Sequence, residues 1–223
     1  MRYAPDCWLM FAGSGMVYGG TARRGEPLDE AAILDPLDEY GVTKAAADLA
    51  LGALARKGLN CVRFRPFNHT GPGQEPAFAV PTFAMQIARI EAGLQPPMIL
   101  VGNLEAERDL LDVRDVATAY ALAVAGTEGL SPGMILNIAS GEPRRIGDLL
   151  DKLLAMSRVE ISVEPDAERL RSNDIPRMIG NAGAARSCLS WRPAFSLEAT
   201  LADVLEDCRA RAEVEKTTGR VGS

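Results

Sequence analysis

The segment Leu37-Asp-Glu-Tyr-Gly-Val-Thr-Lys44 is the stretch from which the rest of the chain is interpreted. Asp38 is a suitable N-cap and an alanine-rich run follows to Ala55, so the segment is predicted to open a helix. Residues four apart share one helix face, which places Tyr40 one turn from Lys44. An ammonium group beside a phenol favours the phenolate. A tyrosine tuned in this way can exchange a proton with an alcohol or a carbonyl near neutral pH.

A second hydroxyl residue, Ser14, lies 26 positions before Tyr40, between two glycines that follow the apolar run Cys7–Ala12. The run is predicted to be a buried parallel strand, so Ser14 is expected at its carboxyl end. That edge is where open α/β sheets bind ligands. Without Ser14, a Tyr and a Lys four apart would fit a half-exposed phenol and a solvated ammonium on a surface helix.

Composition limits the kinds of protein that this chain can be. Its 223 residues are 47% apolar, which suffices for one domain or two small ones. A net charge of −6 disfavours nucleic-acid binding. The apolar runs are far shorter than the roughly 18 residues that span a bilayer, and no basic and apolar leader opens the chain. A cytoplasmic protein with no membrane segment is expected. Scattered cysteines and a single histidine, His69, argue against a metal site.

The order and spacing of Ser14, Tyr40 and Lys44 resemble the extended short-chain dehydrogenase/reductase family of nucleotide-sugar epimerases, dehydratases and reductases. The string Pro66-Phe-Asn-His-Thr-Gly-Pro-Gly-Gln74 resembles, in particular, the GDP-4-keto-6-deoxy-D-mannose reductase branch. The resemblance implies NADP or NAD as cofactor and a GDP-hexose as substrate. It also implies that a homodimer would form through the helix that carries Tyr40 and Lys44.

The resemblance predicts an α/β fold, namely a partial Rossmann-like doubly wound parallel sheet with a smaller C-terminal α/β substrate lobe. Neither GxxGxxG nor GxGxxG occurs, so the glycine-rich turn and the N-terminal strands of the family are expected to be absent. Residues 1–75 are assigned to the dinucleotide-binding domain, whose sheet also receives 110–140. Residues 76–215 are assigned mostly to the substrate lobe and 216–223 to a tail.

Hydrophobic patterns and breaker residues predict the remaining elements. Residues 66–74 are expected to be a loop on the ligand side of the sheet. Residues 102–109 follow the strand 98–101, and residues 110–116 are expected to open a helix that ends at residue 125. The other expected strands are 60–65, 98–101, 134–139 and 158–164, and the other expected helices are 81–93, 146–156 and 196–212.

The resemblance also assigns roles to residues. Ser14, Tyr40 and Lys44 would be catalytic, and Tyr40, Lys44 and Pro66 would lie against the cofactor. Asn68 would contact the sugar diphosphate. The alternative for Asn68 is an Asx-turn residue that holds its loop.

Two arginines and a second asparagine complete the predicted substrate site. Arg108, in the family's Arg-Asp pair, and Arg171 would bind the diphosphate, since a guanidinium can grip phosphate oxygens bidentately. Asn103 stands in a Gly-Asn-Leu triplet that resembles the GDP-sugar branch.

Alternatives remain open for the arginines and for His69. Arg108 could instead form a surface ion pair with Glu105 or Asp112. Arg169 competes with Arg171, and the lone His69 is expected to be a hydrogen-bonded scaffold residue.

The residues after Ser14 bear on the reaction. Sugar-nucleotide dehydratases have an acidic residue one or two positions after the hydroxyl residue, because elimination needs a base for the C5 proton and an acid for the leaving hydroxyl. Gly15 and Met16 stand at these positions here, and neither can transfer a proton. Reduction of a 4-keto-6-deoxy GDP-hexose at C4 with NAD(P)H is therefore preferred. A redox-neutral 4-epimerase needs the same groups and stays open, as does a truncated, non-catalytic remnant that binds a sugar nucleotide.

Overall fold

The computed structural model describes residues 6–169 and 175–219, and the chain divides into two compact units. Each unit draws on three separate stretches of sequence. Unit 1 comprises 1–69, 107–143 and 175–194, and unit 2 comprises 70–106, 144–174 and 195–223.

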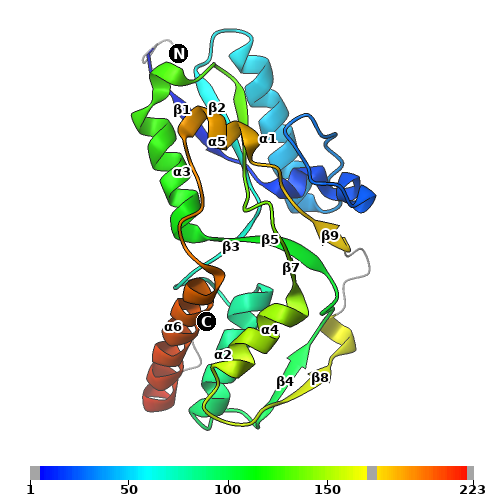
Figure 1. The fold of residues 1–223 in the computed structure, drawn as a ribbon, viewed down its shortest axis with the longest axis vertical. Helices are drawn as coiled ribbons and strands as arrows, with labels where there is room; N and C mark the ends of the chain where they lie inside the picture. The colour runs from blue at the N-terminus through cyan, green and yellow to red at the C-terminus, as the bar shows by residue number, and fades with distance from the viewer. Residues whose placement is uncertain (1–5, 170–174, 220–223) are drawn as a thin grey trace. The chain divides into compact units, whose positions relative to one another are not determined.

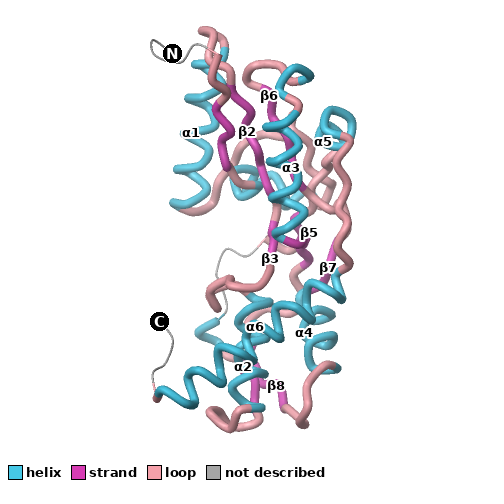
Figure 2. Tube along the Cα trace, turned by 90° about the vertical axis from the view of Figure 1, so that its left-hand side faces the viewer, coloured by secondary structure: helices cyan, strands magenta, loops and turns pink. Residues whose placement is uncertain are grey.

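Unit 1 is built on a parallel sheet of three strands, in the order β1-β2-β6. Figure 1 labels β1 and β2, and Figure 2 labels β2 and β6. The strands are β1 (Leu9–Ala12), β2 (Cys61–Pro66) and β6 (Met134–Ile138). Ala12 of β1 is in register with Phe64, and Asn137 of β6 with Arg65. The central strand β2 is therefore held by backbone ladders on both sides.

Helices cover both faces of this sheet, as a doubly wound fold requires. They are α1 (Glu39–Ala55), α3 (Val113–Ala125) and α5 (Gly183–Leu189). Figure 2 shows α1 on one side of the sheet and α3 with α5 on the other. The predicted α/β class with parallel strands is confirmed.

The core of unit 1 lies between the sheet and these helices. Phe64, Leu136 and Ile138 are fully buried. Trp191 is 1% exposed, and its indole N–H donates to the carbonyl oxygen of Asp115 at 2.9 Å. Residues 175–194 belong to unit 1, with Trp191 packed into the core beside α3, within the range 76–215 that is assigned mostly to the substrate lobe from sequence.

The first strand differs from its prediction. A buried strand over 7–12 was expected, but β1 begins at Leu9, and Leu9 is 42% exposed. Within the described residues β1 pairs only with β2, so it forms one edge of the sheet. An edge strand has a neighbouring strand on one side only, so fewer groups pack around it than around the central strand β2.

Unit 2 contains three helices that pack on one another and one pair of parallel strands. They are α2 (Ala79–Glu91), α4 (Ile146–Ala155), α6 (Leu197–Thr218), β4 (Met98–Val101) and β8 (Ser162–Pro165). Helix α2 contacts both α6 and α4. Phe83, Ile87 and Ile90, which recur at helical spacing, are buried as predicted.

Two elements of unit 2 have different bounds from those expected. The half-exposed strand predicted over 158–164 is the shorter β8, and all four of its residues are exposed. Helix α6 continues to Thr218 instead of 212, so residues 216–218 are helical rather than part of a tail. It ends where Gly219 adopts a left-handed conformation at φ 64°, which glycine tolerates best.

Short elements connect the larger ones. They are η1 (Gly15–Arg24), η2 (Thr127–Gly129), η3 (Ala167–Arg169), β3 (Asn68–Thr70), β5 (Glu107–Asp112), β7 (Pro143–Arg145) and β9 (Arg177–Met178). β5 pairs in parallel with β9 inside unit 1. β3 and β5 fall where a loop and the entry to a helix were predicted. In β5 the buried Asp109 and Leu111 alternate with partly exposed residues, which is the period of a strand. No helix in residues 6–169 and 175–219 is long and apolar enough to cross a membrane.

Candidate active site

Ser14 stands just beyond the carboxyl end of β1, where the strand gives way to the 3-10 helix η1. Its side chain is 7% exposed, and its Oγ accepts a hydrogen bond from the Met16 amide at 3.1 Å. The hydroxyl therefore caps η1. Glycine is required beside it, because a Cβ on Gly13 would overlap the carbonyl oxygen of Phe64 on β2.

Tyr40 and Lys44 occupy the first two turns of α1. The helix begins where predicted, because the Asp38 carboxylate accepts the Gly41 amide at 2.6 Å. Tyr40 is 52% exposed, and the Lys44 Nζ lies 5.7 Å from the centre of its ring. The helix thus brings the phenol and the ammonium group together, as their spacing predicted.

The Lys44 ammonium also connects α1 to the strand that precedes Ser14. Its Nζ donates to the carbonyl oxygen of Ala12 at 2.9 Å, and Ala12 is the last residue of β1. An ammonium group has three donors, so this bond leaves capacity for a ligand hydroxyl. Lys44 and Ser14 therefore both lie at the carboxyl end of β1, and Tyr40 lies beside Lys44.

A second phenol belongs to the surroundings of Tyr40. Tyr120 on α3 packs its ring 4.3 Å from the Phe64 ring. Burial raises the pKa of Tyr120 to about 12, and its electrostatic interaction with Tyr40 adds to that rise. Tyr120 therefore stays protonated at neutral pH.

The predicted cofactor and sugar contacts Pro66 and Asn68 lie at the end of β2 and the start of β3. The Phe67 amide between them donates to the Ile138 carbonyl oxygen at 2.9 Å, which continues the ladder to β6. The Nδ1 of His69 lies 2.9 Å from the Phe67 carbonyl oxygen, a contact that suits the predicted scaffold role. The binding roles of Pro66 and Asn68 stay predictions.

Arg108 lies on β5, where its Nη1 donates to the Ile175 carbonyl oxygen at 2.7 Å. The two carboxylates considered as its ion-pair partners are engaged by other arginines: Glu105 by Arg145, and Asp112 by Arg114. The diphosphate-binding role of Arg108 stays a prediction.

Asp109, next to Arg108, is a buried carboxylate that joins three segments of unit 1. It accepts hydrogen bonds from the amides of Ser140, Gly141 and Gly180 at 2.8–3.1 Å and from the Ser140 hydroxyl at 2.7 Å. Burial raises the pKa of Asp109, and these hydrogen bonds oppose the rise. The carboxylate fixes the strand that carries Arg108.

The other two predicted substrate residues lie outside unit 1 or outside the described residues. Asn103 belongs to unit 2, and its Oδ1 accepts the Glu105 amide at 2.9 Å, which makes an Asx turn. Arg171 falls in 170–174, which the structure does not describe. Substrate contacts by both residues stay predictions.

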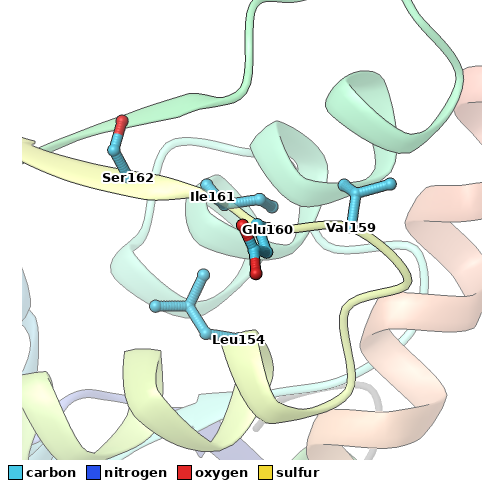
Figure 3. A pocket seen from close by; sticks show the side chains of 5 residues that line it. All are labelled: Leu154, Val159, Glu160, Ile161 and Ser162. Carbon is cyan, nitrogen blue, oxygen red and sulfur yellow. The ribbon is translucent and has the colours of Figure 1, made fainter.

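Unit 2 has two hollows on its own surface. One, of about 580 Å³, lies between the end of α4 and β8 and is lined by Leu154 and residues 159–162 (Figure 3). The other, of about 400 Å³, is lined by Gln86, Arg89, Arg169 and neighbouring residues. Arg169, the competing candidate for the diphosphate, lines the second hollow, and the other predicted site residues within the described part of the chain line neither. Within the described residues no cluster of His, Cys, Asp and Glu side chains could hold a metal ion.

Unit 1 also contains a buried polar network that is not among the residues predicted from sequence. Asp48 of α1 and Arg65 of β2 are 0% and 3% exposed and form a salt bridge at 2.9 Å. Arg65 also donates to the hydroxyl of the buried Tyr18 at 3.0 Å. Two signals could have revealed this network: Asp48 follows Lys44 by one helical turn, and two arginines interrupt an apolar strand.

Comparisons with known proteins bear on this arrangement. A model of the family described as GDP-mannose 4,6 dehydratase matches residues 1–204. The GDP-6-deoxy-D-mannose reductase of Pseudomonas aeruginosa is 33% identical over 208 residues, which are 93% of this chain and 67% of the reductase. The UDP-glucose 4-epimerase of Streptomyces lividans is 27% identical over 92% of this chain and 64% of its own length.

Solved structures give the same result. The structure of RMD from Pseudomonas aeruginosa complexed with NADPH superposes with a TM-score of 0.84 at 31% identity, over 92% of this chain and 67% of that one. The chain therefore spans about two thirds of the length of these three relatives.

Proposed function

The chain belongs to the family described as GDP-mannose 4,6 dehydratase, within the extended short-chain dehydrogenases/reductases. On that premise we propose that it reduces a GDP-4-keto-6-deoxyhexose at C4. Its relatives are NAD(P)-dependent nucleotide-sugar enzymes, and the reductase of Pseudomonas aeruginosa is one of them.

One observation carries the proposal. The Lys44 Nζ donates to the carbonyl oxygen of Ala12 at 2.9 Å and lies 5.7 Å from the Tyr40 ring. A proton donor and a positive charge thus lie at the carboxyl end of the same strand that Ser14 follows. Parallel sheets bind their ligands at that edge.

The residues present fit a nicotinamide cofactor. The Lys44 ammonium has donors beyond the one given to Ala12, and ribose hydroxyls are suitable acceptors. Pro66 would pack against the cofactor at the end of the neighbouring strand β2. When bound, reduced NAD(P) supplies the hydride that the C4 carbonyl carbon receives.

The chain's own groups would act on the carbonyl oxygen. Ser14, whose Oγ accepts the Met16 amide, would donate its hydroxyl proton in a hydrogen bond to the C4 oxygen and polarise the carbonyl. Tyr40 would transfer its phenolic proton to that oxygen as the alcohol forms. The positive charge of Lys44 would stabilise the negative charge that then develops on the phenol oxygen.

Substrate orientation would come from Asn68, Arg108, Asn103 and Arg171. A guanidinium can hold diphosphate oxygens in a fork, and positioning of this kind supplies much of an enzyme's rate. Gly15 and Met16, which follow Ser14, have no proton to transfer. Their presence argues against dehydration by this chain, although the family's description names a dehydratase.

The test is the absorbance of NADPH when the 223-residue protein is mixed with a GDP-4-keto-6-deoxyhexose. We expect stoichiometric loss of NADPH and formation of the 4-hydroxy sugar. Tyr40→Phe should abolish turnover but keep GDP binding in calorimetry, whereas Tyr120→Phe, the matched control at the neighbouring phenol, should stay within about 2-fold of wild type. Turnover by Tyr40→Phe would rule out the role given to that residue.

A 4-epimerase is the alternative, because a UDP-glucose 4-epimerase also matches most of the chain and epimerisation needs the same three groups. It would convert a nucleotide sugar with no net change in NADPH. GDP binding in the absence of any dinucleotide binding would instead favour a non-catalytic protein that binds a sugar nucleotide.

A further inference from the structure

Arg65 lies on the central strand of unit 1. It is 3% exposed, and its backbone is in register with Asn137 on the neighbouring strand β6. Because β2 is paired on both sides, the backbone of Arg65 is a fixed reference point inside the unit.

One side of the Arg65 guanidinium grips α1. Its Nε donates to Asp48 Oδ2 at 2.9 Å, and its Nη2 donates to Asp48 Oδ1 at 2.9 Å. Such a bidentate fork fixes both distance and orientation. Asp48 stands one helical turn after Lys44 and two turns after Tyr40, so the fork holds the rotation of α1 about its axis.

The other side of the guanidinium holds η1, the segment that Ser14 caps. Arg65 Nη1 donates to the Tyr18 hydroxyl at 3.0 Å, and that hydroxyl donates to Asn137 Oδ1 at 2.7 Å. The guanidinium carbon also lies 5.1 Å from the centre of the Tyr18 ring. Tyr18 follows Ser14 by four residues, within η1.

We infer that Arg65 is a positioning residue that sets the Ser14 segment against the helix that carries Tyr40 and Lys44. The inference rests on the proposed function, since it concerns the geometry of the same three residues. One side chain connects the two segments that must converge on a carbonyl oxygen, and it is only 3% exposed, so it acts through the residues that it holds.

The burial of the network makes this connection rigid. A buried charge costs free energy unless it is paired. Arg65 therefore cannot move away from Asp48 without leaving an unpaired charge in the interior. It also cannot leave Tyr18 without removing a partner from a buried hydroxyl. A displacement of η1 or α1 would therefore be resisted at the same guanidinium.

Arg63 is the matched control in the same strand. It stands two residues before Arg65, and its Nη1 donates to the same Asp48 Oδ1 at 2.8 Å. Its Nη2 donates to the carbonyl oxygen of Gly133 at 2.7 Å instead of to a group of η1. A change at Arg63 thus disturbs Asp48 while the bond to Tyr18 stays.

The experiment follows two NMR signals in the intact 223-residue protein without ligands. The reporters are the Tyr40 ring, in protein labelled with ¹³C-tyrosine and assigned with Tyr40→Phe, and the Met16 amide, which donates to Ser14. Arg65→Lys cannot keep the fork and the Tyr18 bond together, so it should displace both signals. Tyr18→Phe should displace the Met16 amide, and Arg63→Met should leave the Met16 amide in place, because Arg63 bonds to Asp48 and Gly133 but to no group of η1.

Two results would overturn the inference: unchanged reporters in Arg65→Lys, or equal displacement of both in Arg63→Met. If Arg65→Lys does not fold, Tyr18→Phe decides, and an unmoved Met16 amide then contradicts the inference. In the reductase assay Arg65→Lys should lower kcat by about 10–100-fold with KM within about 2-fold, and Arg63→Met should change neither by more than about 2-fold. Absence of turnover in the wild type would count against the proposed function alone, because the NMR signals do not depend on it.

Discussion

The Nζ of Lys44 lies 2.9 Å from the carbonyl oxygen of Ala12, so one ammonium group joins the second turn of α1 to the last residue of β1. This contact spans 32 residues of sequence. Lys44 is thus both a structural link and a positive charge 5.7 Å from the centre of the Tyr40 ring.

Replacing Lys44 with Met should separate these two roles. We expect turnover to fall by about 100-fold or more, since the charge beside the proton donor is lost. The free energy of unfolding should fall by only about 1–2 kcal/mol, the value of one charge-assisted hydrogen bond. Initial rates and urea denaturation measure the two effects. Lys57→Met, just beyond the end of α1, is the control and should change neither.

The Asp109 carboxylate should be far more important to stability than an exposed one. Asp109→Asn turns a group that accepts four hydrogen bonds into one that must direct an N–H₂ at backbone donors. We expect a loss of about 2–4 kcal/mol in urea denaturation. The exposed Asp151→Asn on α4 should stay within about 0.5 kcal/mol. Equal losses in the two variants would contradict the assigned role of Asp109.

Unit 2 should lose stability in acid through Glu91. Burial raises the pKa of Glu91, but hydrogen bonds from Arg209 outweigh burial, so the net pKa lies below the ordinary 4.5. A carboxyl group whose pKa is lower in the folded protein than in the unfolded chain contributes its full stabilisation at pH values above the unfolded-state pKa. That contribution is lost as the pH falls through the folded-state pKa. The stability of Glu91→Gln should therefore vary less with pH below 4.5 than that of wild type. Glu160→Gln, an exposed control, should follow the wild-type curve.

The four thiols should divide into two classes. Cys7 and Cys188 are exposed, whereas Cys61 and Cys208 are buried, and burial raises the pKa of Cys208 to about 11. Since the thiolate is the reactive form, only the exposed pair should react quickly with a chromogenic disulfide reagent. All four should react in denaturant. Fast reaction of Cys208 in the native protein would contradict its burial.

Local patterns predicted most of the fold. Asp38 and the alanine-rich run located α1 because caps and propensities act within a few residues. The strand β4 was located to the residue, Met98–Val101, since an apolar run between breakers depends on little else. The Tyr40–Lys44 pair followed from helical geometry alone.

What the patterns missed depends on distant parts of the chain. Strand β5 was not predicted because Arg108 and Asp109 are both polar and interrupt the apolar–polar alternation that identifies a strand in a sequence. Their hydrogen-bond partners lie far along the chain, at 140–141, 175 and 180. The network of Arg65 was missed because Tyr18, Asp48 and Asn137 meet only after the sheet has formed. The placement of 175–194 follows from Trp191, whose partner Asp115 lies 76 residues earlier.

The division of each unit among three stretches of sequence governs how the protein can be made in the cell. On the ribosome, β1 and β2 emerge long before Trp191, and unit 1 cannot close until Trp191 has left the exit tunnel. Nascent chains that stall before that point would expose the apolar surface that Trp191 covers, and chaperones would be expected to hold them. Unit 1 therefore completes its core only after residues 175–194 have been synthesised.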